Sequence, residues 1–184
     1  QVGPSNFLAG VCQSVIVWHT CVTVPFSIRR DREGDYFFSS QMKLILSGDE
    51  LFPEIVRMLD EGHTVTLKTK GSSMRPFIVG GRDSVVLEAV HGEVCTGDVV
   101  LACIPGRGYI LHRVYRREGD ACVLMGDGNL CATERCSRDA ICGRVTQIIR
   151  RGRVVDCASR RERLLARWWR HLLPLRRVLL KLMS

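Results

Sequence analysis

The clearest periodic pattern in the chain lies in residues 48–61, where apolar positions recur at intervals of three and four. This spacing places apolar side chains on one face of a helix. Ser47, followed three residues later by Glu50, has the pattern of a capping box, and Gly62 is a typical helix stop. The sequence therefore predicts a short amphipathic helix over 48–61. Its apolar face consists of Leu51, Ile55, Met58 and Leu59.

After this helix, the pattern changes to short runs rich in β-branched and aromatic residues. Glycine pairs and Gly-Asp steps separate the runs and mark turns. We therefore predict a mainly β fold, a compact and mostly antiparallel domain whose β core covers 64–156. The predicted strands are 64–70, 84–90, 98–104, 109–116, 121–125 and 142–149.

The C-terminal segment 158–184 is helical in composition, with a stripe of basic residues and other faces of leucine and tryptophan. Pro174 should kink this helix. The pattern is typical of a helix in a membrane interface, which would make the protein peripherally membrane-associated. Packing of the helix against its own domain or a partner explains the pattern equally well and fits a cytoplasmic protein. The stripe consists of Arg163, Arg167, Arg170, Pro174, Arg177 and Lys181.

Residues 1–41 show no clear amphipathic period. Residues 7–28 are apolar, but polar residues and Pro25 interrupt them, so they are a weak candidate for a transmembrane segment. Met42 opens the well-patterned part of the chain. Our hypothesis is that Met42 is the natural start and that 1–41 is upstream sequence or a poorly ordered leader.

The formal net charge of +8 is concentrated at one end of the 184-residue chain. From Arg150 onward lie 11 of the 27 Lys and Arg and 2 of the 19 Asp and Glu, so this end carries +9 and the rest −1. Nucleic-acid binders usually carry a basic patch on the folded domain, whereas this excess is interleaved with tryptophan and leucine. We therefore expect no nucleic-acid partner.

The nine cysteines include no Cys-x-x-Cys pair, so paired zinc knuckles are not supported. A metal site built from Cys131, Cys136, Cys142 and a histidine is the alternative to small, reduced thiols. Base rates favour the thiols, and we expect no metal. The cysteine content weakly favours a reducing compartment.

The segment with the most chemical information follows the predicted strand 64–70, where residues 71–76 read Gly-Ser-Ser-Met-Arg-Pro. This segment resembles the type I signal peptidases, whose nucleophilic serine is followed by methionine and, after one residue, by proline. Ser73 takes the place of that nucleophile. A serine hydroxyl is a poor nucleophile at neutral pH, so it needs a base within hydrogen-bond reach.

In this broad group the base is a lysine on a later strand or a histidine at the equivalent place. No lysine occurs in 71–180. Residues 109–114 read Tyr-Ile-Leu-His-Arg-Val, which resembles the His-Arg-Val motif of the histidine type. The resemblance therefore makes His112 the general base that takes the proton from Ser73 and later donates it to the leaving amine.

A carboxylate should orient the histidine, and residues 126–129 resemble the Gly-Asp-x-Asn box that follows the base in these enzymes. Asp127 is the first choice for this acid, and Glu134 and Asp139 are the alternatives. Two further matches, Gly-Asp-Val-Val at 97–100 and Gly-Arg-Val at 143–145, are expected to be structural. Together the four motifs extend the resemblance over about 64–149.

The resemblance implies the β fold of signal peptidases and SOS-type self-cleaving repressors, here in a peptidase domain over 42–157. It implies hydrolysis of a peptide or protein precursor through an acyl-enzyme on Ser73, without a cofactor, and small residues beside the scissile bond. The rival is a catalytically inactive domain of the same fold that binds peptides or a membrane surface.

One position departs from the family pattern. Many signal peptidases have a serine two positions before the nucleophile, and here that position is Gly71. The oxyanion hole would then rest on the backbone N–H of Ser73, aided by Ser72. A missing donor costs about two orders of magnitude in rate.

Overall fold

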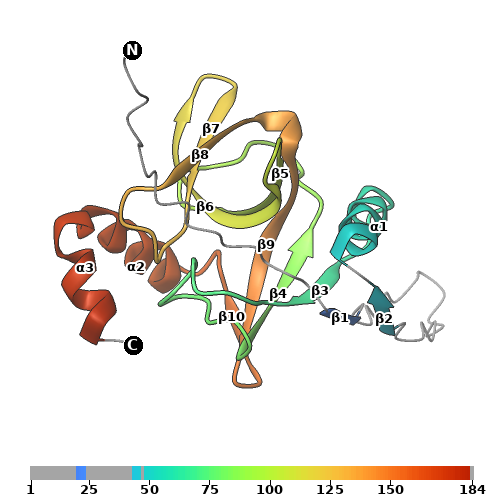
Figure 1. Cartoon of the computed structure of the whole chain (residues 1–184), viewed down its shortest axis with the longest axis horizontal. Coiled ribbons are helices and arrows are strands. Elements are labelled where there is room, and N and C mark those ends of the chain that lie inside the picture. The colour runs from blue at the N-terminus through green and yellow to red at the C-terminus, as the bar shows by residue number, and fades with distance from the viewer. Residues whose placement is uncertain (1–19, 24–42, 47, 183–184) are drawn as a thin grey trace, which may run out of the picture.

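The computed structural model of the chain describes residues 20–23, 43–46 and 48–182, with side chains from residue 51 onward (Figure 1). Its strands form one antiparallel, ten-stranded sheet that curls around itself. The order across the sheet is β2-β1-β3-β4-β9-β5-β6-β7-β8, and β10 pairs with β9. The strands are β1 Thr20–Thr23, β2 Lys43–Leu46, β3 Val65–Lys68, β4 Asp83–Glu88, β5 Val99–Ile104, β6 Gly108–Glu118, β7 Ala121–Met125, β8 Thr133–Ser137, β9 Ile141–Arg150 and β10 Arg153–Asp156.

The sheet encloses two apolar clusters because its strands bend at bulges in the β4–β9, β5–β9 and β6–β7 pairs. One cluster joins α1 (Gly48–Asp60) to β3, β4 and β9. The other fills the curl formed by β5, β6 and β7. The mainly β fold predicted from the sequence is confirmed, with a helix before the β domain and helical structure after it.

Helix α1 forms because its apolar face is buried. Leu51, Ile55 and Leu59 are at most 1% exposed, and Met58 is 6% exposed. All four belong to the cluster with β3, β4 and β9, as the helical period predicted. Ser47, the expected N-cap, lies outside the described residues.

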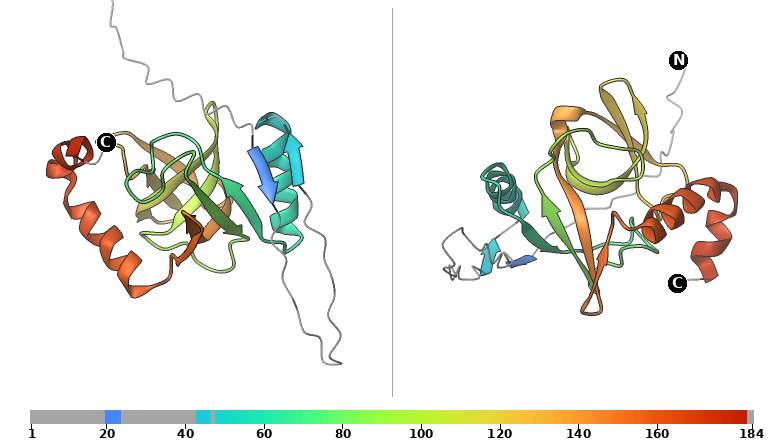
Figure 2. Two further views of the ribbon diagram at one scale, coloured as in Figure 1. Left: turned by 90° about the horizontal axis from the view of Figure 1, so that it is seen from below. Right: turned by 180° about the vertical axis from the view of Figure 1, so that it is seen from behind.

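The C-terminal segment forms two helices rather than one. Helix α2 (Arg160–His171) starts at the N-cap Ser159, whose hydroxyl accepts a hydrogen bond from the Glu162 N–H. It ends at His171 with Leu172 as its C-cap, and α3 (Leu173–Leu182) follows at once. Pro174, at the second position of α3, cannot donate to the preceding turn, so the predicted kink is a complete break. The helices α2 and α3 lie at the opposite end of the molecule from α1 (Figure 2).

The sheet extends beyond the predicted strands. Thr20–Thr23, which the sequence analysis assigned to the leader, forms β1 between β2 and β3. The other strands not predicted are β2, β8 and β10. Strand β8 carries Glu134 at a buried position, and an acidic residue on the inward face hides the alternation that reveals a strand. The expectation that Met42 is the natural start stays a prediction.

Candidate active site

Ser73 lies in the loop that follows β3, and hydrogen bonds at the base of this loop fix its shape. The backbone N–H and hydroxyl of Thr69 both donate to the carbonyl of Asp83, at 3.1 and 2.8 Å. The carboxylate of Asp83 is fully buried and accepts from the Val79 N–H and the Arg82 guanidinium. The loop that carries Ser73 is therefore tied at both ends to β3 and β4.

The Gly-Asp-Gly-Asn turn after β7 packs directly against Ser73. The N–H of Gly128 donates to the Ser73 carbonyl at 2.7 Å. A Cβ atom on Gly126 would lie 2.4 Å from the same carbonyl oxygen, and one on Gly128 would lie 2.7 Å from the Ser72 carbonyl oxygen. Only glycine allows this close approach of two backbones. The two glycines of this box thus bring the Ser73 loop against the end of β7.

Strand pairing then brings the Ser73 loop toward the part of β6 that carries His112. Arg113 on β6 pairs with Met125 on β7, so the next step of this register sets Gly126 opposite His112. Because Gly126 packs against the Ser73 carbonyl, the Ser73 loop lies at the end of β7 that neighbours His112 on β6. A recess of about 10 Å³ beside Ser73 is also lined by Leu111, the neighbour of His112.

His112 is held by a buried carboxylate, and that carboxylate belongs to Glu134. The Nδ1 atom of His112 lies 2.9 Å from Oε2 of Glu134, and the two side chains are 8% and 5% exposed. Glu134 reaches His112 through two strand pairings. Glu134 on β8 pairs with Leu124 on β7, and Leu124 pairs with Val114 on β6. His112 is two residues from Val114 and therefore on the same face of the sheet.

Arg107 adds a second contact to Glu134, from the turn between β5 and β6. Burial raises the pKa of Glu134, but the hydrogen bond and charge of His112 and the charge of Arg107 together lower it by more. The net effect is a pKa below the ordinary value, which keeps Glu134 ionised at neutral pH. An ionised Glu134 favours a proton on Nδ1 of His112 and leaves Nε2 as the basic nitrogen.

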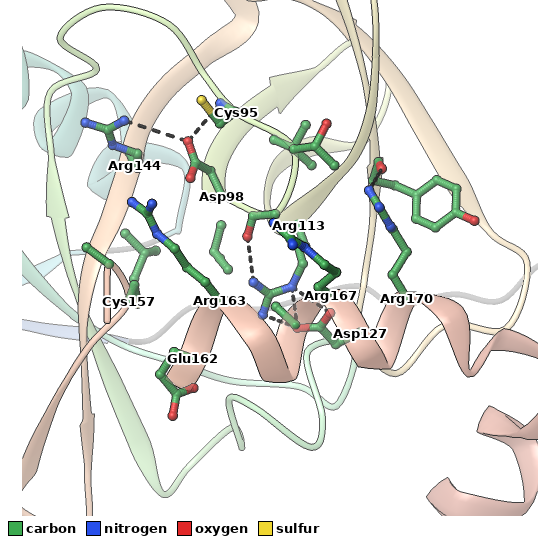
Figure 3. Close-up of a pocket in the computed structure, with 18 of the residues that line it drawn as sticks. Cys95, Asp98, Arg113, Asp127, Arg144, Cys157, Glu162, Arg163, Arg167 and Arg170 are labelled. Carbon is green, nitrogen blue, oxygen red and sulfur yellow. Dashed lines mark hydrogen bonds and ion pairs between the residues drawn. The ribbon is translucent and has the colours of Figure 1, made fainter. Parts of the chain in front are cut away.

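Asp127, the first choice for this acid, has a different partner. Its carboxylate accepts from Nε and Nη2 of Arg113 at 2.8 and 2.7 Å, and the Arg113 guanidinium also donates to the Gly97 carbonyl (Figure 3). The backbone carbonyl of Asp127 accepts from the indole of Trp169 at 2.8 Å. The structure therefore corrects the pairing of Asp127 with His112, because successive side chains of β6 point to opposite faces of the sheet.

Asp139 lies in a short 3-10 turn after β8, where no residue is buried, and it does not contact His112. Ser72 is exposed, and its carbonyl accepts from the Arg75 N–H. Within residues 51–182, the backbone N–H of Ser73 has no hydrogen-bond partner, so it can still donate to an oxyanion. Gly71 has a φ of +80°, which suits glycine.

The side chains of Ser73 and His112 make no hydrogen bond to each other within the part of the chain that the structure describes. Catalytic hydrogen bonds of this kind often tighten only when a substrate is bound. The site combines a serine on a braced loop with a histidine whose Nδ1 meets a carboxylate and whose Nε2 has no hydrogen-bond partner among the described residues. Such an arrangement can support nucleophilic attack with general-base assistance.

The cysteines with described side chains are free thiols, and no group of three metal-ligating residues forms among the described residues. Cys136 is buried in the second apolar cluster, whereas Cys131 is exposed. Burial raises the pKa of Cys136 to about 11. A buried thiol of this kind is a poor metal ligand, because the ligand is the thiolate.

The sequence profile of the Peptidase S24-like family matches residues 37–146. The chain therefore belongs to the Peptidase S24-like family. No curated protein matches the sequence. The family match confirms the superfamily of peptidases and self-cleaving repressors indicated by the sequence motifs, and with it a peptidase-type fold. The histidine-type site stays a prediction.

Sequence reasoning found Glu134 only as an alternative and missed three further residues around the site. Arg107, Trp169 and Arg176 hold Glu134, Asp127 and Asn129 respectively. Arg107 lies in a turn, whereas Trp169 lies in α2 and Arg176 in α3, and no local pattern reveals which side of these helices docks. The sequence offered one indication for Trp169, because a buried indole N–H usually donates a hydrogen bond and a tryptophan in this helix could therefore dock against the domain.

Proposed function

We propose that this protein is a serine endopeptidase in which Ser73 attacks the scissile carbonyl with His112 as general base. The observation that supports this most directly is the buried His112–Glu134 pair, at 2.9 Å, on the strand beside the Ser73 loop. A buried imidazole whose Nδ1 meets a carboxylate has the arrangement of the base in serine hydrolases. In this proposal Glu134, rather than Asp127, orients His112.

The reaction proceeds through an acyl-enzyme. The Ser73 hydroxyl oxygen forms a bond to the carbonyl carbon while its proton passes to Nε2 of His112. The backbone N–H of Ser73 donates to the oxyanion, and His112 then gives its proton to the leaving amine. Water, deprotonated by His112, hydrolyses the ester and restores Ser73. The substrate is a peptide or protein precursor, which the enzyme cleaves as a signal peptidase would.

The size of the recess beside Ser73 supports a preference for substrates with a small side chain next to the scissile bond. Its volume is about 10 Å³, and Met74, Ile78 and Leu111 form its apolar wall. These three residues are buried and packed into the first apolar cluster, so enlarging the recess would disturb the core. Alanine or glycine at this substrate position fits the recess better than leucine.

The test is covalent labelling by an acylating inhibitor of the signal peptidase type, measured by intact-mass spectrometry with and without membranes. Wild-type protein should gain one adduct on Ser73, and both Ser73→Ala and His112→Ala should abolish it. Ser137→Ala, at an exposed serine on β8, is the matched control and should still form an adduct. If folded wild-type protein forms no adduct in either condition, the proposal is wrong and the inactive binding domain takes its place.

We also propose that α2 and α3 bind an anionic membrane surface. Six of the large apolar residues that are more than 40% exposed lie on these helices, with Trp168 at 66% and Leu182 at 78%. Basic residues are interleaved with them, so two copies of this face would repel each other while anionic lipids would attract it. No helix among the described residues meets the length and apolarity needed to cross a bilayer. The apolar residues are Leu164, Leu165, Trp168, Leu175, Val178 and Leu182.

Co-sedimentation with vesicles tests this surface. Wild-type protein should bind vesicles that contain phosphatidylglycerol and bind much less to pure phosphatidylcholine. Leu164→Ser combined with Trp168→Ser should lower binding, whereas Val154→Ser, which is 62% exposed on β10, should not. Equal binding to both vesicles, or equal loss with Val154→Ser, would contradict the proposal.

A further inference from the structure

A cavity of about 460 Å³ lies between α2 and the sheet, next to the Gly-Asp-Gly-Asn turn but separate from the recess beside Ser73. Its inner wall is apolar and includes Val99, Val145 and Ile148, all at most 3% exposed. A cavity of this size and mixed character is in the range of small-molecule sites. It is not needed by the proposed peptidase chemistry.

Arginines surround the opposite side of this cavity. Arg163, Arg167 and Arg170 project into it from successive turns of α2 (Figure 3). Arg144 faces them from β9 (Figure 3). Six arginines and four carboxylates line the cavity altogether, which leaves an excess of two positive charges.

The ion pairs show which arginines carry this excess. Arg113 is neutralised by Asp127 at 2.7 Å, and Arg144 lies 3.7 Å from Asp98. Arg170 donates to the carbonyl of Tyr115, and Arg176 donates to the carbonyls of Asn129 and Trp169. The side chains of Arg163 and Arg167 have no hydrogen-bond or ion-pair partner within residues 51–182. Of the acids that line the cavity, Asp156 accepts from the Ala158 N–H, and Glu162 lies in the first turn of α2.

We propose that this cavity binds a phosphate monoester, with Arg163 and Arg167 as its principal ligands. A phosphate monoester carries nearly two negative charges at neutral pH and offers three acceptor oxygens. Two guanidinium groups from successive turns of one helix match that charge and can each donate twin hydrogen bonds. The apolar wall then accommodates the group that carries the phosphate.

Two probes distinguish a soluble source from a lipid source. Glycerol 1-phosphate supplies the phosphate without an apolar body, and dihexanoyl phosphatidate supplies the same group on two short acyl chains. Isothermal titration at low ionic strength with the full chain should give saturable binding at one site for at least one probe. Tighter binding of the phosphatidate would assign the site to a lipid head group, and equal affinities would assign it to soluble phosphates.

Three variants decide whether the cavity is the site. Arg163→Gln and Arg167→Gln should each weaken binding about tenfold, because each removes a charge-assisted hydrogen-bond donor. Arg161→Gln removes the same charge from the same helix but does not line the cavity, so its affinity should stay within about twofold of wild type. Unchanged thermal unfolding would show that all three variants fold.

Two results would overturn the proposal. One is the lack of saturable binding of either probe by folded wild-type protein. The other is an equal loss of affinity in Arg161→Gln, which would mean that the net charge of α2 attracts the probes without a defined site. Neither result depends on the peptidase activity, because Ser73→Ala protein should bind the probes as wild type does.

Discussion

Two neighbouring residues of β6, His112 and Arg113, each bind a buried carboxylate, but on opposite faces of the sheet. His112 meets Glu134 through one nitrogen, and within residues 51–182 its other nitrogen has no hydrogen-bond partner. Arg113 meets Asp127 through two hydrogen bonds at 2.8 Å or less and a third at 3.1 Å. An imidazole can exchange a proton near neutral pH, whereas a guanidinium cannot. The first pair is therefore suited to chemistry and the second to holding the Gly-Asp-Gly-Asn turn.

The largest expected effect is on acylation, and it separates the two carboxylates. Glu134→Gln should slow labelling of Ser73 by roughly 10²- to 10⁴-fold, because the amide no longer favours the correct tautomer of His112. Asp127→Asn should slow labelling by less than about tenfold in the folded fraction, because its partner is Arg113. Rates are measured by intact-mass spectrometry at matched folded concentration. A greater loss in Asp127→Asn would restore Asp127 as the acid.

The second expected effect is on stability and separates the two arginines. Arg113→Met should lower the free energy of unfolding by about 3–5 kcal/mol, because it leaves the buried carboxylate of Asp127 without its partner. Arg107→Met should cost about 1 kcal/mol or less, because Arg107 is 58% exposed and Glu134 keeps His112. Urea unfolding measures both values. Similar losses in the two variants would mean that Arg113–Asp127 is not the structural pair.

A smaller effect should come from the helix that holds Asp127. Trp169→Phe removes the indole donor to the Asp127 carbonyl and should cost about 1 kcal/mol in the free energy of unfolding. Trp168→Phe is the matched control, because Trp168 is 66% exposed and Trp169 only 7%. Thermal unfolding of both variants provides the measurement. Equal losses would show that α2 does not stabilise the turn through Trp169.

The last expected effect is on pH dependence. Because the pKa of Glu134 is lower in the folded protein, its ionised form stabilises the fold above the unfolded value of 4.5. This contribution is lost as the pH falls from 4.5 through the lower pKa that Glu134 has in the folded protein. The free energy of unfolding should therefore fall more steeply with acid in wild type than in Glu134→Gln. Glu93→Gln, at a side chain that is 79% exposed, should retain the wild-type slope.

The sequence predicted the elements whose pattern is local. The apolar spacing of α1 predicted the residues that it buries, and β-branched runs predicted β3 to β7 and β9 within a few residues. Strand β8 was missed because Glu134 is an inward-facing acid in a short polar run. The break between α2 and α3 was expected only as a kink, since a proline fixes where a helix is disturbed but not how far.

The motifs pointed to Ser73, His112 and a carboxylate nearby, but they could not choose among Asp127, Glu134 and Asp139. That choice depends on which face of β6 each strand approaches. Asp127 follows directly after β7 and meets the face of Arg113, whereas Glu134 returns along β8 to the face of His112. The register of three strands decides this, and register is a property of the assembled sheet.

By itself, the sequence determined the mainly β domain and its leading helix, because these follow from local spacing, and its motifs named Ser73 and His112 as the proposed nucleophile and base. The tertiary structure decided which carboxylate binds His112, which side of α2 packs on the domain, and where a cavity with unpaired arginines opens. These outcomes depend on contacts between residues far apart in the chain, such as Trp169 with Asp127. Their geometry is set only when the sheet has closed and the helices have docked.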